Sequence, residues 1–239
     1  NAYYGRGPLD EAGLKAALKL RAGLERLSAE RVSAEMRSLL VAPQAMRAVA
    51  ALFDYGLLVG LLGGVPRLAR FERLVAIEEA LCVEADAMLR LAALGVFVQE
   101  DASRLAACLR LSNAERAVLE LGAAKLIELP DEDAAKRALY RLGGSDFARH
   151  VLLAWADSGA SPEDKAWRAA LALPERWQAP PFPLRGSDVM ALGDLKGPEV
   201  GEMLRRLEAE WIGGGFAASR EELLARAASL GRKSPKQDR

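Results

Sequence analysis

The sequence has few of the residues from which disulfide frameworks, zinc sites and histidine-based active sites are built. Its 239 residues include two cysteines, Cys82 and Cys108, and these do not form a C-x-x-C pair. We therefore expect neither a disulfide framework nor a zinc site, and a reducing, cytoplasmic compartment. His150 is the single histidine, which argues against a Ser-His-Asp triad and a multi-histidine metal site.

Long apolar runs are also missing. No segment approaches the ~18 to 20 uninterrupted apolar residues that a membrane-spanning helix needs, and the first residues lack the basic-then-apolar pattern of a signal peptide. We therefore expect a soluble chain without a membrane partner. Because the sequence begins with Asn1 and not with methionine, we also expect it to be part of a longer protein.

Alternating β-branched segments are nearly absent, whereas helical periodicity and helix-start signals recur along the chain, so we predict an all-α fold. Two capping boxes, in which a serine and a glutamate three residues later satisfy each other's backbone donors, mark helix starts at Ser112 and Ser219. Further helices are expected over residues 9–27 and from Ser28 to about Val41, and at starts near Pro43, Pro66, Asp131, Ser145, Ser161–Pro162, Ser187 and Pro198.

Proline usage indicates where the chain divides. Four prolines fall between Pro174 and Pro183, a density typical of a linker. We predict helical segments over residues 1–64, 65–174 and 182–230, followed by a polar, disordered end over 231–239.

Two segments carry a resemblance to a known family. Residues 27–40 resemble the neck-helix motif of class II tRNA nucleotidyltransferases and poly(A) polymerases, Ser/Ala-x-Glu-Arg-x-x-x-Glu-Leu/Met-x-x-Leu-Leu. Ser33 departs from this pattern, because many relatives have arginine there. The matching positions are Ser28, Glu30, Arg31, Glu35, Met36, Leu39 and Leu40.

The second segment, residues 182–201, resembles the tail of the bacterial enzymes in the same family. Its Leu-x-Gly-x-Asp-Val/Leu-Met-x-Leu-Gly and Gly-Pro-x-Val-Gly blocks are both complete. In addition, Asn1 to Gly5 resembles the end of the block that holds the family's nucleotide-selecting Asp and Arg. The middle of the chain is supported only by its helical character and by Leu111 to Glu115.

The resemblance implies an elongated or curved array of neck, body and tail helices that binds the acceptor stem and T-arm elbow of tRNA, and not DNA. It also implies an N-terminal catalytic head, Mg²⁺ and CTP or ATP in the full-length enzyme. This sequence has no Gly-Ser head signature with its Asp-x-Asp pair. We therefore expect no catalytic residue, metal site or cofactor in this chain, which should be inactive alone.

The same resemblance suggests roles for individual residues, each with a plainer alternative. Glu30, Arg31 and Glu35 would support the nucleotide pocket, or Arg31 and Glu35 would form an ordinary surface ion pair. The arginines at 67, 70 and 73 recur every three residues as a basic ridge for phosphate, or as a solvated face. The candidate RNA-binding residues are Arg67, Arg70, Arg73, Lys196, Gly197, Arg205 and Arg206.

Two functional hypotheses remain open. The first is the tRNA-binding part of an enzyme that completes or repairs the 3′-CCA end, or that adds poly(A), two activities that this sequence does not separate. The second is a non-catalytic helical scaffold or protein-interaction module. The four tryptophans at helical spacing are expected in the core and are not assigned to RNA.

Overall fold

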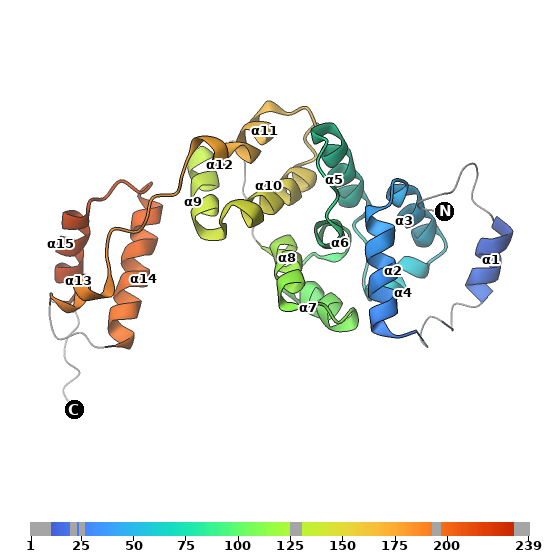
Figure 1. The fold of residues 1–239 in the computed structure, drawn as a ribbon, viewed down its shortest axis with the longest axis horizontal. Helices are drawn as coiled ribbons and strands as arrows, with labels where there is room; N and C mark the ends of the chain where they lie inside the picture. Colours follow the sequence, from blue (N-terminus) through green and yellow to red (C-terminus); the bar gives the residue numbers. More distant parts are fainter. Residues whose placement is uncertain (1–10, 20–22, 24–26, 125–130, 193–196, 232–239) are drawn as a thin grey trace. The chain divides into compact units, whose positions relative to one another are not determined.

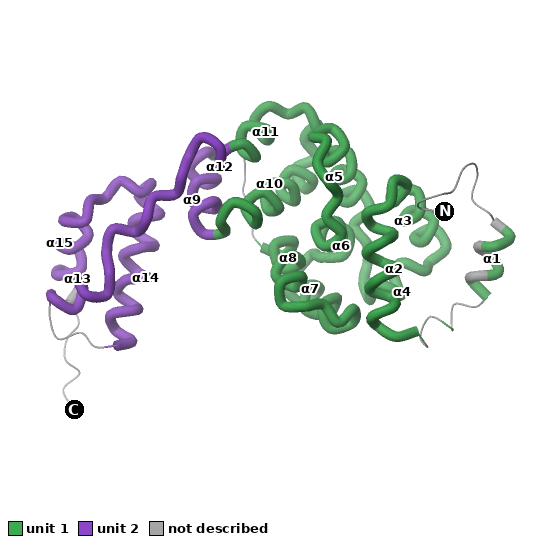
Figure 2. Tube along the Cα trace, viewed as in Figure 1, with its two compact units in different colours: residues 1–131, 142–172 green, residues 132–141, 173–239 purple. Residues whose placement is uncertain are grey.

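The computed structural model describes residues 11–19, 23, 27–124, 131–192 and 197–231, and all statements below concern these residues. Within these ranges the chain forms helices joined by turns, without a β-strand, which confirms the predicted all-α class (Figure 1). No described helix is long and apolar enough to cross a membrane. The chain divides into two compact units (Figure 2). The elongated or curved arrangement and the division at residues 64 and 174 stay predictions.

Unit 1 comprises residues 1–131 and 142–172 and is built around a buried helix, α6. Every residue of α6 from Met88 to Gly95 is buried, since α2, α5, α7, α8 and α10 pack around it. The helices of unit 1 are α1 (Glu11–Lys19), α2 (Ala29–Val41), α3 (Ala45–Asp54), α4 (Leu57–Leu62), α5 (Leu68–Leu81), α6 (Ala87–Gly95), α7 (Gln99–Cys108), α8 (Asn113–Ala123), α10 (Gly144–Ser158) and α11 (Lys165–Leu171).

Small residues allow the central helices of unit 1 to approach closely. A Cβ atom at Gly122 of α8 would lie 3.2 Å from the Cβ of Ala92 and 3.3 Å from that of Val96. Large side chains fill the remaining core, with Phe71 and Leu74 from α5 and Trp155 from α10 fully buried. The apolar face of each surrounding helix therefore packs against α6 or its neighbours, as amphipathic helices do in a single core.

Unit 2 comprises residues 132–141 and 173–239 and has a smaller, aromatic core. Trp211 of its longest helix is 2% exposed, and Tyr140, Phe182 and Phe216 surround it with ring centroids 5.1 to 5.7 Å apart. The helices of unit 2 are α9 (Glu132–Leu142), α12 (Leu173–Arg176), α13 (Gly186–Met190), α14 (Pro198–Gly213) and α15 (Arg220–Gly231).

The helix-start signals are confirmed where a side chain caps the helix, and several other starts are displaced. Helices α3 and α5 begin two residues after Pro43 and Pro66, and α13 begins one residue before Ser187. Ser28 accepts a hydrogen bond from the backbone of Arg31, and the Ser112 and Ser219 capping boxes form. However, Ser145 lies inside α10, whose N-cap is Gly143. The helix expected at Ser161–Pro162 begins later, because Asp164 accepts from the backbone of Ala166 and Trp167 and caps α11. Of the predicted disordered end, residues 231–239, Gly231 is the last residue of α15, and residues 232–239 lie outside the described residues.

Candidate nucleic-acid interface

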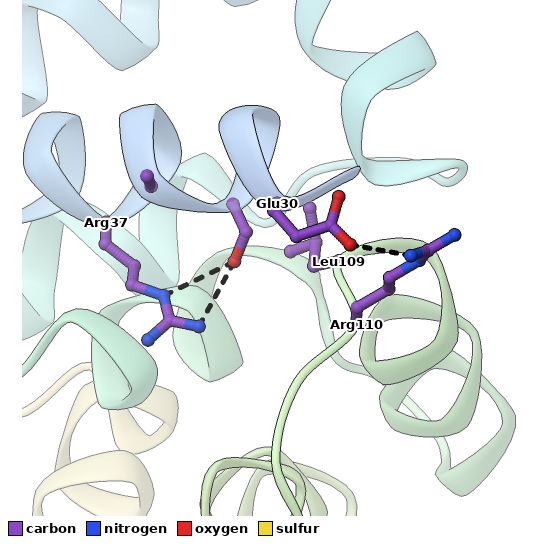
Figure 3. A pocket seen from close by; sticks show the side chains of 6 residues that line it. Glu30, Arg37, Leu109 and Arg110 are labelled. Carbon is purple, nitrogen blue, oxygen red and sulfur yellow. Dashed lines mark hydrogen bonds and ion pairs between the residues drawn. The ribbon is translucent and has the colours of Figure 1, made fainter. Parts of the chain in front are cut away.

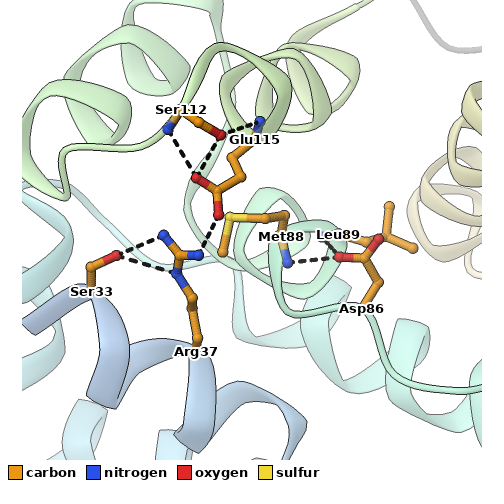
Figure 4. Close-up of polar contacts among 7 residues, drawn as sticks. All are labelled: Ser33, Arg37, Asp86, Met88, Leu89, Ser112 and Glu115. Atoms are coloured by element: carbon orange, nitrogen blue, oxygen red, sulfur yellow. Dashed lines mark hydrogen bonds and ion pairs between the residues drawn. The ribbon is translucent and has the colours of Figure 1, made fainter. Parts of the chain in front are cut away.

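In unit 1, the neck-like segment, residues 27–40, meets the segment from Leu111 to Glu115 at a polar junction between α2 and the start of α8 (Figure 4). Arg37 of α2 forms an ion pair with Glu115 of α8, and it donates to the Ser33 hydroxyl through Nε at 3.3 Å and Nη2 at 3.2 Å. Ser33 is 4% exposed, so the position that departs from the family motif supports Arg37 from inside. The junction thus fixes the arginine in one orientation.

Glu115 has two tasks at this junction. One carboxylate oxygen accepts from both the backbone N–H and the hydroxyl of Ser112, each at 2.8 Å, and the other faces Arg37. Hydrogen bonds from the Ser112 backbone and side chain, with a lesser contribution from Arg37, hold the pKa of Glu115 below its usual value against the opposing effect of burial. Glu115 therefore caps α8 and anchors α2 while ionised.

An open pocket of about 260 Å³ lies beside this junction, under the N-terminal half of α2 (Figure 3). Arg110, in the turn after α7, forms an ion pair with Glu30 at 2.6 Å, and both side chains are exposed, at 69% and 58%. A hydrogen bond to the backbone at Glu30 and the Arg110 guanidinium lower the pKa of Glu30. The residues that line the pocket are Glu30, Ser33, Ala34, Arg37, Leu109 and Arg110.

Arg110 also has an unusual backbone. Its φ of +48° lies in the left-handed region, which costs a residue with a Cβ atom roughly 1 to 2 kcal/mol. Neither Arg37 nor Arg110 is among the residues that the sequence singled out. The capping box at Ser112 was visible, but nothing in the sequence shows that it faces α2 or that Arg110, two residues before Ser112, has positive φ.

Of the expected nucleotide-pocket residues, the structure brings only Glu30 to this pocket. Arg31 and Glu35 lie exposed on α2, and no ion pair joins them among the described residues, so the expected pair between them is wrong. Glu30 binds across to Arg110 instead, because its carboxylate faces the α7–α8 turn. Their supporting role in a nucleotide pocket stays a prediction.

The expected ridge of arginines on α5 is wrong as an exposed surface. Arg70 is 1% exposed and donates to the carbonyls of Val96 at 3.2 Å and Gly122 at 3.4 Å. Its Nη2 forms an ion pair with Asp157 Oδ2 of α10 at 3.1 Å, but the angle between the two groups does not allow a hydrogen bond. Burial lowers the pKa of Arg70 to about 10, against the opposing effect of Asp157, so the side chain stays charged at neutral pH.

The other two members of the ridge lie at the edge of the same contact. Arg67 is 24% exposed, bonds Asp157 at 2.6 Å and lies over the ring of Phe97, 4.7 Å from its centroid. Arg73 is half-buried with Nη1 beside Gly159, and its Nε is buried without a partner. Three-residue spacing does place the arginines together, but the side that they share faces α10.

Three of the four candidate RNA-binding residues in the tail-like segment lie within the described residues. Lys196 lies outside the described residues. Gly197 precedes α14 with φ +46°, a conformation that favours glycine. Arg205 and Arg206 are exposed on α14, where Arg205 donates to the Gly201 carbonyl at 3.3 Å and Arg206 pairs with Glu210 at 3.4 Å. These two therefore face solvent as a contact to RNA would require.

The residues that could carry catalytic or metal chemistry are buried or scattered. His150 is 4% exposed, its Nδ1 has no hydrogen-bond partner, and burial lowers its pKa. Within the described ranges no three His, Cys, Asp or Glu side chains gather as metal ligands would. Trp155 and Trp167 are buried and stacked with centroids 6.1 Å apart, and Trp211 is buried in unit 2, as expected of core tryptophans.

Comparison with known proteins gives matches along the chain. Residues 8–71 match the family described as "Probable RNA and SrmB- binding site of polymerase A". The chain is 23% identical over 233 residues to a mouse protein, "CCA tRNA nucleotidyltransferase 1, mitochondrial", in an alignment that covers 93% of this chain and 52% of that protein. The human protein of the same name is 35% identical over 51 residues, which are 21% of this chain and 12% of that protein.

A further relative, "Uncharacterized 28 kDa protein in petA 5'region" of Rhodospirillum rubrum, is 44% identical over 86 residues, 32% of this chain and 33% of that protein. These alignments cover at most about half the length of the relatives. The RNA-binding family region includes α2, and the mouse alignment extends over nearly the whole helical chain. The chain is therefore similar to the poly(A) polymerase and CCA-adding nucleotidyltransferase family, and residues 8–71 match a region described as its RNA-binding site.

Proposed function

We propose that this chain is the tRNA-binding helical portion of a tRNA nucleotidyltransferase that completes or repairs the 3′-CCA end. The observation that carries the proposal is the alignment of 93% of the chain with a CCA tRNA nucleotidyltransferase. The neck-like and tail-like motifs, found in the family's order at residues 27–40 and 182–201, support it.

The structure suggests how such a chain would hold RNA. Proteins recognise RNA helices mainly through shape and through contacts to phosphates and 2′-hydroxyls, so a rigid helical surface with fixed arginines suits the task. In unit 1 the Arg37 junction fixes α2 against α8, which keeps this surface in one form. On unit 2, Arg205 and Arg206 present guanidinium groups to solvent.

Nucleotide addition itself would need groups that the described helices do not assemble. We propose that the full enzyme is cytoplasmic and uses Mg²⁺ with CTP or ATP, the metal supplying charge neutralisation at the transferred phosphate. The described residues hold no cluster of metal-ligating side chains, so they do not fit the ion. The proposed task of this chain is therefore binding and positioning.

The test is equilibrium binding of the complete 239-residue chain to tRNA and to an unrelated folded RNA of equal length, measured over a range of salt concentrations. We expect tighter binding to tRNA at every salt concentration, with affinity falling as salt rises because phosphate contacts release counterions. Equal affinity for both RNAs would show that the chain binds RNA without a preference for tRNA, and would contradict the tRNA proposal. Absence of RNA binding would favour the scaffold alternative.

A further inference from the structure

The turn after α7 has an arginine at a position where helices usually place glycine. The Leu111 N–H donates to the Ala106 carbonyl at 2.9 Å and the Arg110 N–H to the Ala107 carbonyl at 3.3 Å, and Arg110 has φ +48°. These two hydrogen bonds define the left-handed helix ending that glycine makes without strain. Glycine would adopt this backbone conformation with less strain than arginine. An arginine at this position therefore points to a use for its guanidinium group.

The partner of that guanidinium is weak and replaceable. Arg110 is 69% exposed, and the carboxylate of Glu30, 2.6 Å away, is on a side chain that is itself 58% exposed. Exposed ion pairs contribute little because water screens them and both side chains lose freedom. The Glu30 carboxylate accepts from one arm of the guanidinium, Nη1, whereas a phosphate can accept from both arms of the fork and so displace Glu30.

The surroundings of Arg110 leave room for such a group. Arg110 and Glu30 lie at one end of the pocket under α2, Leu109 lies behind them, and Arg37 lies at the other end (Figure 3). Arg37 is occupied by Ser33 and Glu115, which hold it in place. A ligand would therefore meet one fixed cation and one cation whose partner can be exchanged, at the mouth of an open pocket.

We propose that Arg110 is a phosphate-binding residue that takes a backbone phosphate of RNA at the mouth of this pocket, with Glu30 as the counter-ion that it releases. The inference rests on the proposed RNA-binding function. RNA is the source that we favour, because α2 lies within the region that matches the family's RNA-binding site. A free nucleotide carries the same chemical group and is a separate arm of the test.

The substitution Arg110→Gly separates binding from folding. Glycine relieves the left-handed backbone, so we expect the melting temperature to stay level or to rise by about 2 to 4 °C. Removing the guanidinium should weaken tRNA binding roughly tenfold and reduce the dependence of log Kd on log salt by about one unit. In the reverse direction, Glu30→Gln frees Arg110 and should tighten binding by about two- to fivefold.

Two control variants match the change. Cys82, at the end of α5, has φ +53° with the same hydrogen bond from Val83 to Glu78, so Cys82→Gly gives the same backbone relief without loss of charge. Arg168 is a partly exposed arginine paired with Glu163, so Arg168→Ala removes one charge elsewhere in unit 1. Both variants should bind tRNA like the unsubstituted chain.

The binding series has distinct outcomes. Wild-type affinity in folded Arg110→Gly, or an equal loss in Arg168→Ala, would overturn the inference and leave the proposed function in place. If the unsubstituted chain binds no RNA, both fail. The last measurements are titrations of the unsubstituted chain and of Arg110→Gly with CTP and with inorganic phosphate. If Arg110→Gly changes the affinity for CTP and not the affinity for tRNA, RNA is not the source of the phosphate.

Discussion

At the scale of single residues, Arg90 shows how a buried cation can be held inside unit 1. It is 6% exposed, its Nε lies 2.7 Å from Glu78, and its Nη1 donates to the Leu40 carbonyl at 2.7 Å. Burial raises the pKa of Glu78 to about 7, outweighing the opposite effect of Arg90. The two side chains thus tie the end of α2 to α5 and α6.

Arg90→Met should destabilise the chain by about 3 to 5 kcal/mol, because it leaves the Glu78 carboxyl group and the Leu40 carbonyl buried without their donor. Urea unfolding followed by circular dichroism measures this change. The double variant Glu78→Met with Arg90→Met should lose less than the single one, since no carboxyl remains to be buried. A loss below ~1 kcal/mol in Arg90→Met would show that water reaches Glu78.

The Glu115 carboxylate should make the junction sensitive to acid. Its pKa is lowered in the folded chain, so the stability that it contributes is fully present above its unfolded pKa, near 4.5, and is lost as pH falls through the folded value. Glu115→Gln should therefore cost about 1 kcal/mol at pH 7 and progressively less below pH 4.5. Unfolding curves of both proteins from pH 7 to pH 3 measure the difference, and a constant difference would contradict this assignment.

Local sequence patterns predicted one half of this junction and could not predict the other. The capping box of Ser112 and Glu115 depends on residues three apart, which a sequence displays directly. The Arg37 contact to Glu115 joins residues 78 positions apart, and the left-handed φ of Arg110 arises from a helix ending that usually has glycine. The first is a consequence of how α2 packs, which no local pattern contains, and the second is hidden because arginine does not mark a helix ending as glycine does.

At the scale of elements, α5 carries its arginines on the side that faces α10. The three-residue spacing correctly predicts that Arg67, Arg70 and Arg73 share one side, but the charge of that side does not show whether it faces solvent. Asp157 and the carbonyls at the ends of α6 and α8 make the inward orientation possible, because they give the guanidinium of Arg70 partners inside the core. These partners come from other helices, so the sequence of α5 does not show them.

Arg70→Met should therefore act on stability and not on RNA contacts. We expect a loss of about 2 to 4 kcal/mol, because Val96 and Gly122 lose a buried donor, while the salt dependence of tRNA binding by the folded protein stays unchanged. Chemical unfolding and binding titrations test the two statements. The exposed Arg205→Met serves as the control, with a change in stability within about 0.5 kcal/mol. Unchanged stability with a reduced salt slope in Arg70→Met would restore the exposed ridge.

At the scale of the whole molecule, the chain forms two cores, and the second one takes a helix from the middle of the sequence. Tyr140 of α9 packs on Trp211 and Phe216 and donates its hydroxyl hydrogen to Glu208 of α14. The proline-rich stretch from Pro174 to Pro183 marks where unit 2 continues, but it cannot show that α9 packs with it. Proline content reports local backbone stiffness, whereas membership in a core depends on contacts between distant residues.

Tyr140→Ala should loosen unit 2 while leaving unit 1 intact. The substitution removes two aromatic contacts and a hydrogen bond, so we expect a loss of about 2 to 4 kcal/mol from unit 2. Hydrogen exchange should rise in α14 and α15, while α5 and α10 keep their protection, because their core contains none of the altered contacts. Tyr140→Phe keeps the ring and should lose only about 1 kcal/mol through the missing bond to Glu208. Faster exchange in α5 and α10, with α14 unaffected, would assign α9 to the core of unit 1 instead.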